Sequence, residues 1–99
     1  MDYELVMAIL QITIKRVIDE KNDDYVLRTV KVPYDYQQEV TSMTQTVMES
    51  LSSHVLNELE FYHPRKYIIQ KVQKDMQAFL IGYMRTNKPN MSAGSLTGR

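Results

Sequence analysis

The chain has 99 residues, of which 43% are hydrophobic and 24% are charged, and its twelve basic and twelve acidic side chains balance to zero formal charge. This length fits one domain built around a single core. The sequence contains no cysteine, which excludes a disulfide framework and a thiolate metal site. A neutral domain has no general electrostatic reason to bind nucleic acid, so that class of function is disfavoured.

Apolar residues at helical spacing predict a first helix from Leu5 to about Ile18. Acidic residues precede the apolar run and Lys15-Arg16 follow it, which is the wrong order for a secretory signal peptide. The run is also too short to cross a bilayer, so we expect a soluble, cytoplasmic protein. Because this helix is apolar around most of its circumference, it should be buried, either as a central core helix or against a second chain.

Residues 21–24 predict a turn, and the β-branched residues of 25–32 predict an extended connector or a short edge strand that ends at Pro33. Asp35 is the expected N-cap of a second helix, which should run from about Tyr36 to Glu60. The stripe of this helix that should face the core consists of Val40, Met43, Val47, Leu51, Val55 and Leu59.

The segment after His63-Pro64 fits two structures. Residues 67–72 and 79–84 can form two strands of a hairpin that turns near residues 74–77, since β-branched and aromatic residues are enriched there and Gly82 interrupts the second run. The same residues also share one face of a single helix. Residues 87–99 are predicted to be a flexible polar tail, so the domain itself should span residues 1–86.

Residues capable of catalysis are scarce. His54 and Glu58 share a helix face, but two ligands do not make a metal site, and His63 lies in a predicted break. The three glycines form no phosphate-binding loop. We therefore predict a non-enzymatic protein without metal or cofactor.

Basic residues alternate with tyrosines around the second break, where Arg65, Lys66, Lys71 and Lys74 accompany Tyr62 and Tyr67. Such interleaving can bind single-stranded nucleic acid through phosphate contacts and base stacking. Acidic residues flank the patch, however, and the chain is neutral overall. A solvated face of a strand or helix is the favoured interpretation.

The run from Arg65 to Val72 after a proline, Tyr34-Asp35-Tyr36, Met43-Thr44 and Phe79-Leu80-Ile81-Gly82 resemble the Tctex-type dynein light chain family. The resemblance implies an α+β fold, with two N-terminal helices packed on a small antiparallel sheet. The family continues with a Trp-Asp pair and two more strands. This chain has no Trp, so its sheet would be incomplete or completed by another chain.

The resemblance also implies a function. Such light chains form homo- or heterodimers and hold an extended segment of a dynein intermediate chain at a sheet edge. This would place the chain in the cytoplasm on the cytoskeleton, for example in the axoneme of a cilium or flagellum. The alternative is an all-α, three-helix structural subunit of a larger protein assembly. In the light-chain interpretation, the residues expected to bind the partner protein are Lys66, Tyr67, Ile69, Lys71, Phe79, Ile81 and Tyr83.

Overall fold

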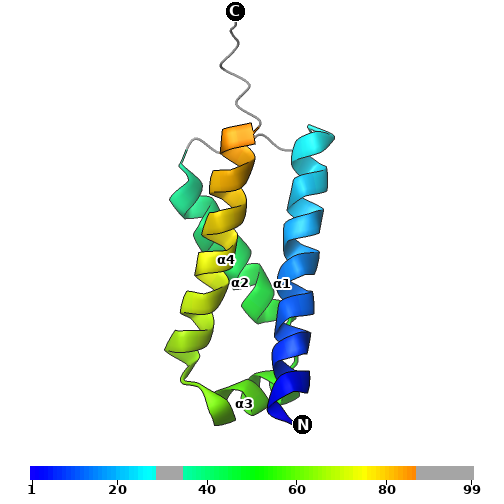
Figure 1. Ribbon diagram of the computed structural model, residues 1–99, viewed down its shortest axis with the longest axis vertical. Coiled ribbons are helices and arrows are strands. Elements are labelled where there is room, and N and C mark those ends of the chain that lie inside the picture. The colour runs from blue at the N-terminus through cyan, green and yellow to red at the C-terminus, as the bar shows by residue number, and fades with distance from the viewer. Residues whose placement is uncertain (29–34, 87–99) are drawn as a thin grey trace, which may run out of the picture.

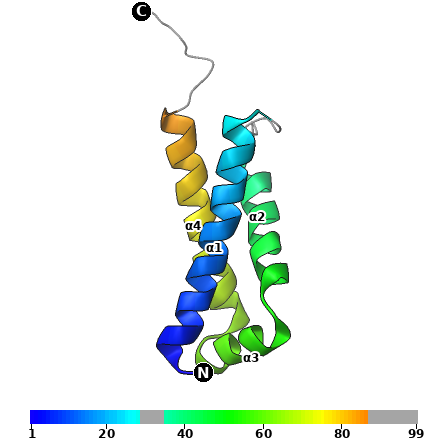
Figure 2. The ribbon, with the colours of Figure 1, turned by 90° about the vertical axis from the view of Figure 1, so that its right-hand side faces the viewer.

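The computed structural model describes residues 1–28 and 35–86, which form four helices. Helices α1 and α4 run in the same direction and α2 runs in the opposite one, while the short α3 lies across the end of the bundle where α1 begins (Figures 1 and 2). None of these helices combines the length and the apolar character needed to cross a membrane within the described ranges. The helices are α1 (Tyr3–Val26), α2 (Tyr36–Ser50), α3 (Ser53–Tyr62) and α4 (Arg65–Thr86).

The predicted antiparallel sheet is wrong, since no described residue lies in a strand. Segments 67–72 and 79–84, expected to form a hairpin, are parts of the continuous helix α4. A strand that buried Ile68 and Val72 would also bury Gln70 between them, because alternate residues share a face. A helix buries one residue in four and leaves Gln70 exposed. The buried row of α4, each member at most 1% exposed, is Ile68, Val72, Met76 and Leu80.

The all-helical alternative fits the structure, although the described residues form four helices where three were predicted. The predicted second helix is divided, because α2 ends at Ser50 and Leu51 is extended. Ser52 then caps α3, and its hydroxyl accepts a hydrogen bond of 3.1 Å from the backbone N–H of Val55. The apolar spacing continues unchanged through this break, so periodicity alone could not reveal it.

Other expectations for this part of the chain are confirmed. The Asp35 carboxylate caps α2 by accepting a hydrogen bond of 3.0 Å from the backbone N–H of Gln37. The break at His63-Pro64 separates α3 from α4. All six residues of the predicted stripe are buried, namely Val40, Met43, Val47, Leu51, Val55 and Leu59.

The first helix is longer than predicted. The turn expected at residues 21–24 is absent from the structure because α1 continues to Val26, so the extended connector expected from residue 25 is also wrong at its start. Tyr25 explains the extension, because its ring is buried and its hydroxyl donates a hydrogen bond of 2.6 Å to Glu39 Oε2 of α2. Lys21 Nζ lies 3.0 Å from the same carboxylate. Leu27 and Arg28 form a turn after the helix, and residues 29–32 of the predicted connector and the predicted polar tail lie outside the described residues.

Helix α1 is also less buried than predicted. Its core row is Val6, Leu10, Ile14 and Val17, all nearly inaccessible to solvent. Leu5 and Ile12, however, remain 50% and 59% exposed. A single chain therefore covers only part of the apolar circumference of this helix.

The buried Tyr25 hydroxyl makes stability depend on pH. Burial, and then the hydrogen bond to Glu39, raise the pKa of Tyr25 well above its ordinary value of 10.0. The unfolded chain therefore releases this proton at a lower pH than the folded protein does, so the stabilisation is complete below pH 10 and decreases as the pH rises above it. Above pH 10, Tyr25 should contribute up to about 1.4 kcal/mol per pH unit to the fall in the free energy of unfolding. In Tyr25→Phe this contribution should be absent, so its stability should fall less steeply.

Urea unfolding of the native chain and of Tyr25→Phe between pH 8 and 11 measures this difference. The values at pH 8 give the cost of losing the hydrogen bond itself, because the phenol is protonated in both states there. Stability curves that stay parallel up to pH 11 would show that the hydroxyl is more accessible to water than the structure indicates.

The buried hydroxyl of Thr44 in α2 leads to a second prediction about stability. Its hydroxyl oxygen is buried and has no hydrogen-bond partner among the residues that the structure describes. Because Val has nearly the same shape and no hydroxyl to desolvate, we expect Thr44→Val to raise the free energy of unfolding by about 1 kcal/mol. Thr13→Val is the matched control, since the buried Thr13 hydroxyl donates a hydrogen bond of 2.9 Å to the carbonyl of Ile9. Chemical denaturation should show no gain for that control.

Candidate protein-binding surface

Five rings meet at the end of the bundle that α3 closes. They come from the first turn of α1, the end of α3, the residue that follows it, and the first turn of α4. Ring centroids lie 5.3 Å apart for Phe61 and Tyr62, 5.1 Å for Tyr62 and Tyr3, 5.6 Å for Tyr3 and His63, and 4.2 Å for His63 and Tyr67. The contacts form one continuous row, which we call the aromatic end cluster: Phe61, Tyr62, Tyr3, His63 and Tyr67.

Hydrogen bonds fix the inner rings of this cluster. The Tyr3 hydroxyl and His63 Nε2 share a hydrogen bond of 3.0 Å. The Tyr62 hydroxyl donates to the backbone carbonyl of Met1 at 3.2 Å. The chain turns sharply at Pro64, which brings the first turn of α4 back beside the end of α3. The beginning of α1 is thereby held against the end of α3 and the start of α4, about 60 positions later in the chain, at one end of the molecule (Figure 1).

Four rings of the cluster are open to solvent. Phe61 is 82% exposed, and Tyr3, Tyr62 and Tyr67 are each more than a third exposed. Since Phe61 buries little of its surface in the fold, it adds little to stability through burial. Contiguous exposed apolar surface is typical of sites that bind other proteins, and tyrosine is enriched in such sites.

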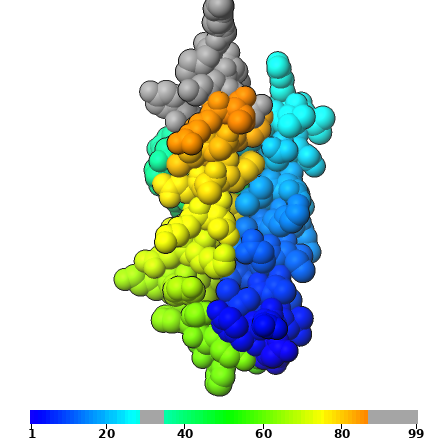
Figure 3. All heavy atoms as spheres, in the orientation of Figure 1, coloured from blue at the N-terminus to red at the C-terminus, as the bar shows by residue number. Residues whose placement is uncertain are grey.

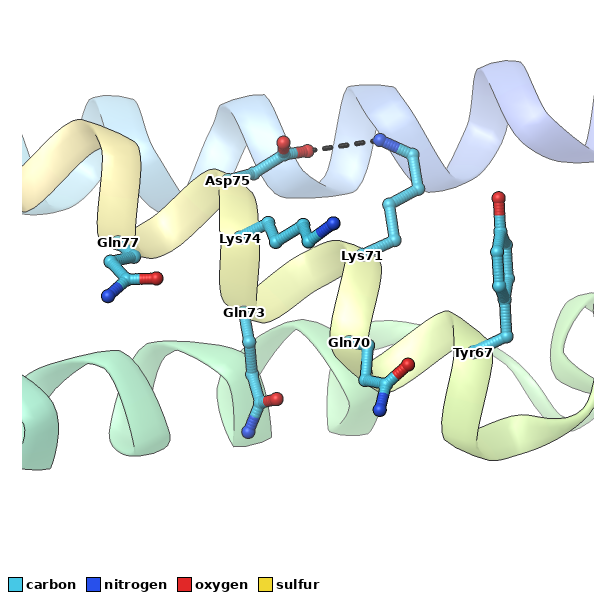
Figure 4. A pocket seen from close by; sticks show the side chains of 7 residues that line it. All are labelled: Tyr67, Gln70, Lys71, Gln73, Lys74, Asp75 and Gln77. Carbon is cyan, nitrogen blue, oxygen red and sulfur yellow. Dashed lines mark hydrogen bonds and ion pairs between the residues drawn. The ribbon is translucent and has the colours of Figure 1, made fainter.

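The exposed side of α4 continues from this cluster. An open depression of about 580 Å³ follows the helix, and the side chains that line it stand along one helix (Figure 4). Lys71 Nζ and Asp75 Oδ2 form an ion pair of 3.2 Å across its edge. Helix α4 carries five basic residues and one acidic residue, so this side is positively charged. The lining residues are Tyr67, Gln70, Lys71, Gln73, Lys74, Asp75 and Gln77.

All lining residues come from α4, so the depression has no second wall among the described residues. Such a surface cannot enclose a small molecule as a binding pocket does. No group of three or more His, Cys, Asp or Glu side chains in residues 1–28 and 35–86 could hold a metal ion. The arrangement suits contact with another large surface.

The structure brings together only some of the predicted partner-binding residues. Lys66 and Tyr67 are exposed at the start of α4, and Lys71 lines the depression beside them. Phe79 and Tyr83 instead pack around Tyr25, with ring centroids 6.4 and 5.1 Å from it, on the core side of α4.

The two remaining predicted residues, Ile69 and Ile81, are partly buried on the same helix. The edge strand that was to unite all seven does not exist in the described part of the chain.

Sequence reasoning missed Tyr3 and Phe61 as members of this surface. Tyr3 lies 60 positions from His63, and no spacing rule connects residues that far apart. A weak signal did exist for Phe61, because it follows Leu59 by two positions and therefore leaves the apolar stripe of its helix. The predicted interleaving of tyrosines and basic residues did locate Tyr62 and Tyr67.

Compared with models of known protein families, with curated proteins and with solved structures, the chain matches none of them. The resemblance to dynein light chains, the dynein partner and the cytoskeletal location therefore stay predictions from the sequence. The aromatic end cluster and the basic side of α4 are the surfaces of the described residues that suit binding.

Proposed function

We propose that this chain is a non-catalytic, all-helical structural subunit of a larger protein assembly, and that the aromatic end cluster binds a partner protein. The observation that carries the proposal is the 82% exposure of Phe61 at the end of a row of rings in mutual contact. A large apolar ring in this position contributes most to the binding free energy when the surface of a partner covers it.

The cluster is already organised for binding. Hydrogen bonds hold Tyr3, Tyr62 and His63 in place, so a partner loses little affinity to the ordering of these side chains. The ion pair of 2.7 Å between Glu60 and Arg65 lies beside the cluster and supplies a polar rim. A partner with an apolar pocket for Phe61 and acceptors for the tyrosine hydroxyls would match this surface.

Binding by strand addition is not part of the proposal, because that mode needs a free strand edge and the described residues form none. A dynein intermediate chain, the partner implied by the sequence resemblance, would have to be recognised through the aromatic end cluster instead.

Phe61→Ser tests the proposal. We expect the variant to keep the free energy of unfolding within about 0.5 kcal/mol of the native chain, because the ring is almost fully exposed. We expect it to bind the partner at least about tenfold more weakly, since burying this ring would supply part of the binding energy. Affinity purification with quantitative mass spectrometry identifies the protein whose recovery falls, and calorimetry with that protein measures the loss.

Leu27→Ser is the matched control. Leu27 is an apolar residue of similar exposure, 71%, at the end of α1 far from the cluster. A partner recovered equally with Leu27→Ser and with the native chain, but lost with Phe61→Ser, supports the proposal. Recovery of the same set of proteins with both variants would contradict it.

A further inference from the structure

Helix α1 carries a second exposed apolar surface, separate from the aromatic end cluster. Leu5 and Ile12 are 50% and 59% exposed, and Ala8 between them is also exposed. Spacings of three and four residues place these side chains on one face of the helix. We call this surface the outer strip: Leu5, Ala8 and Ile12.

The outer strip faces away from the core of its own chain. At about 100° per residue, its centre lies roughly 140° around the helix from the row that contains Val6, Leu10 and Val17. An exposed helix normally carries polar residues at such positions. Helix α1 forms the right-hand side of the molecule in the space-filling view and lies in front of α2 and α4 when that side faces the viewer (Figures 3 and 2). All three residues of the strip are exposed on this helix.

Charged residues border the strip in a self-complementary order. Glu4 and Lys15 are eleven positions apart, about three helical turns, and so lie on one flank. Arg16 lies on the other flank. Asp2 stands just before α1 and caps it by accepting a hydrogen bond of 2.8 Å from the backbone N–H of Leu5. The acidic residues thus stand at the beginning of α1 and the basic residues stand beyond Ile12.

We propose that a second copy of this chain packs against the outer strip, with the two α1 helices antiparallel and a twofold axis near Ala8. Leu5 then lies beside Ile12 of the second copy, and Ala8 at the axis is small enough for the two helices to approach closely. The antiparallel order brings Glu4 near Lys15 of the second copy. A parallel pair would instead place like charges next to each other.

The pairing is compatible with the contacts inside each chain. Lys15 forms an ion pair of 2.8 Å with Asp19, but both side chains are more than half exposed and can accept another neighbour. Tyr3 points to a different side of α1, where it contacts Tyr62 and His63. The dimer contact and the aromatic end cluster are therefore separate surfaces, and each can be tested without the other.

Analytical ultracentrifugation of the full chain tests the association. We expect the native chain to sediment with twice its mass of 11.6 kDa. Ile12→Lys should raise the dissociation constant of the dimer at least tenfold, and circular dichroism should show an intact helical fold because the position is exposed. Phe61→Lys is the control and should leave the dimer unchanged. A monomeric native chain, or a dimer lost with Phe61→Lys and kept with Ile12→Lys, would overturn the proposal.

Cysteine cross-linking tests whether the two α1 helices are antiparallel. Introduced cysteines report cleanly because the chain has no cysteine of its own. A disulfide requires Cα atoms about 4.4–6.8 Å apart. Ala8→Cys, close to the axis, should form covalent dimers under mild oxidation. Leu5→Cys and Ile12→Cys should each fail to cross-link alone but should cross-link when the two variants are mixed. Efficient cross-linking of Leu5→Cys and Ile12→Cys each with itself would mean a parallel pair and would refute the arrangement.

Substitutions that reverse the charge of single residues test the antiparallel arrangement independently. Glu4→Lys and Lys15→Glu should each raise the dissociation constant several-fold, because each creates a pair of like charges across the interface. The double variant restores opposite charges, so its dissociation constant should return to within about twofold of the native one. If the free-energy effects of the two single substitutions simply add in the double variant, the two residues do not contact each other across the interface.

Discussion

The buried row of α4 is the constraint on which the rest of the fold depends. Its four side chains are each at most 1% exposed, and α4 packs against α2, which crosses behind it in Figure 1. Burial of each such side chain stabilises the folded state by roughly 1.5–3 kcal/mol. Since the buried residues of α4 recur every fourth position on one face, residues of the opposite face such as Gln70 and Lys74 remain in solvent. This single row therefore fixes both the helical state of the segment and the exposure of its basic side.

Polar contacts add specificity at the two ends of the bundle. At one end, the carboxylate of Glu39 binds both the Tyr25 hydroxyl and the Lys21 ammonium group, which fixes the position of α2 against α1. At the other end, the Ser52 cap and the break at Pro64 make α3 short and transverse. The direction of α3 in turn brings the end of that helix to the beginning of α1. The aromatic end cluster is thus a consequence of how the bundle is closed.

Much of the core could be predicted from the sequence, because apolar spacing is a local property. The stripe from Val40 to Leu59 was located residue by residue, and so were the Asp35 cap and the break before α4. The choice between strands and a helix for residues 67–84 could not be made in this way. Ile and Val favour strands, but packing against α2 outweighs that preference, and only the folded structure contains it.

The candidate site could be predicted less completely than the core, because part of it depends on packing between segments that are distant in sequence. Its basic and aromatic residues on α4 are neighbours in sequence, and the pattern indicated them. Tyr3 joins the cluster only through a long-range contact, and the exposure of Phe61 depends on the direction of α3. The exposed strip on α1 was foreseen only as an excess of apolar residues. Its position opposite the core became visible once the packing of the helix was known.

The acidic end of α1 has a further consequence. A helix macrodipole places partial negative charge at the C-terminus, where basic residues are favourable, but the last turn of α1 contains none and Asp23 and Asp24 lie there instead. The intrinsic electrostatics of this turn therefore oppose helix formation. Its helical state is maintained by the anchoring of Tyr25 in the core. Local unfolding of the last turn should consequently be tied to release of one side chain, and amide hydrogens there should exchange without unfolding of the whole bundle.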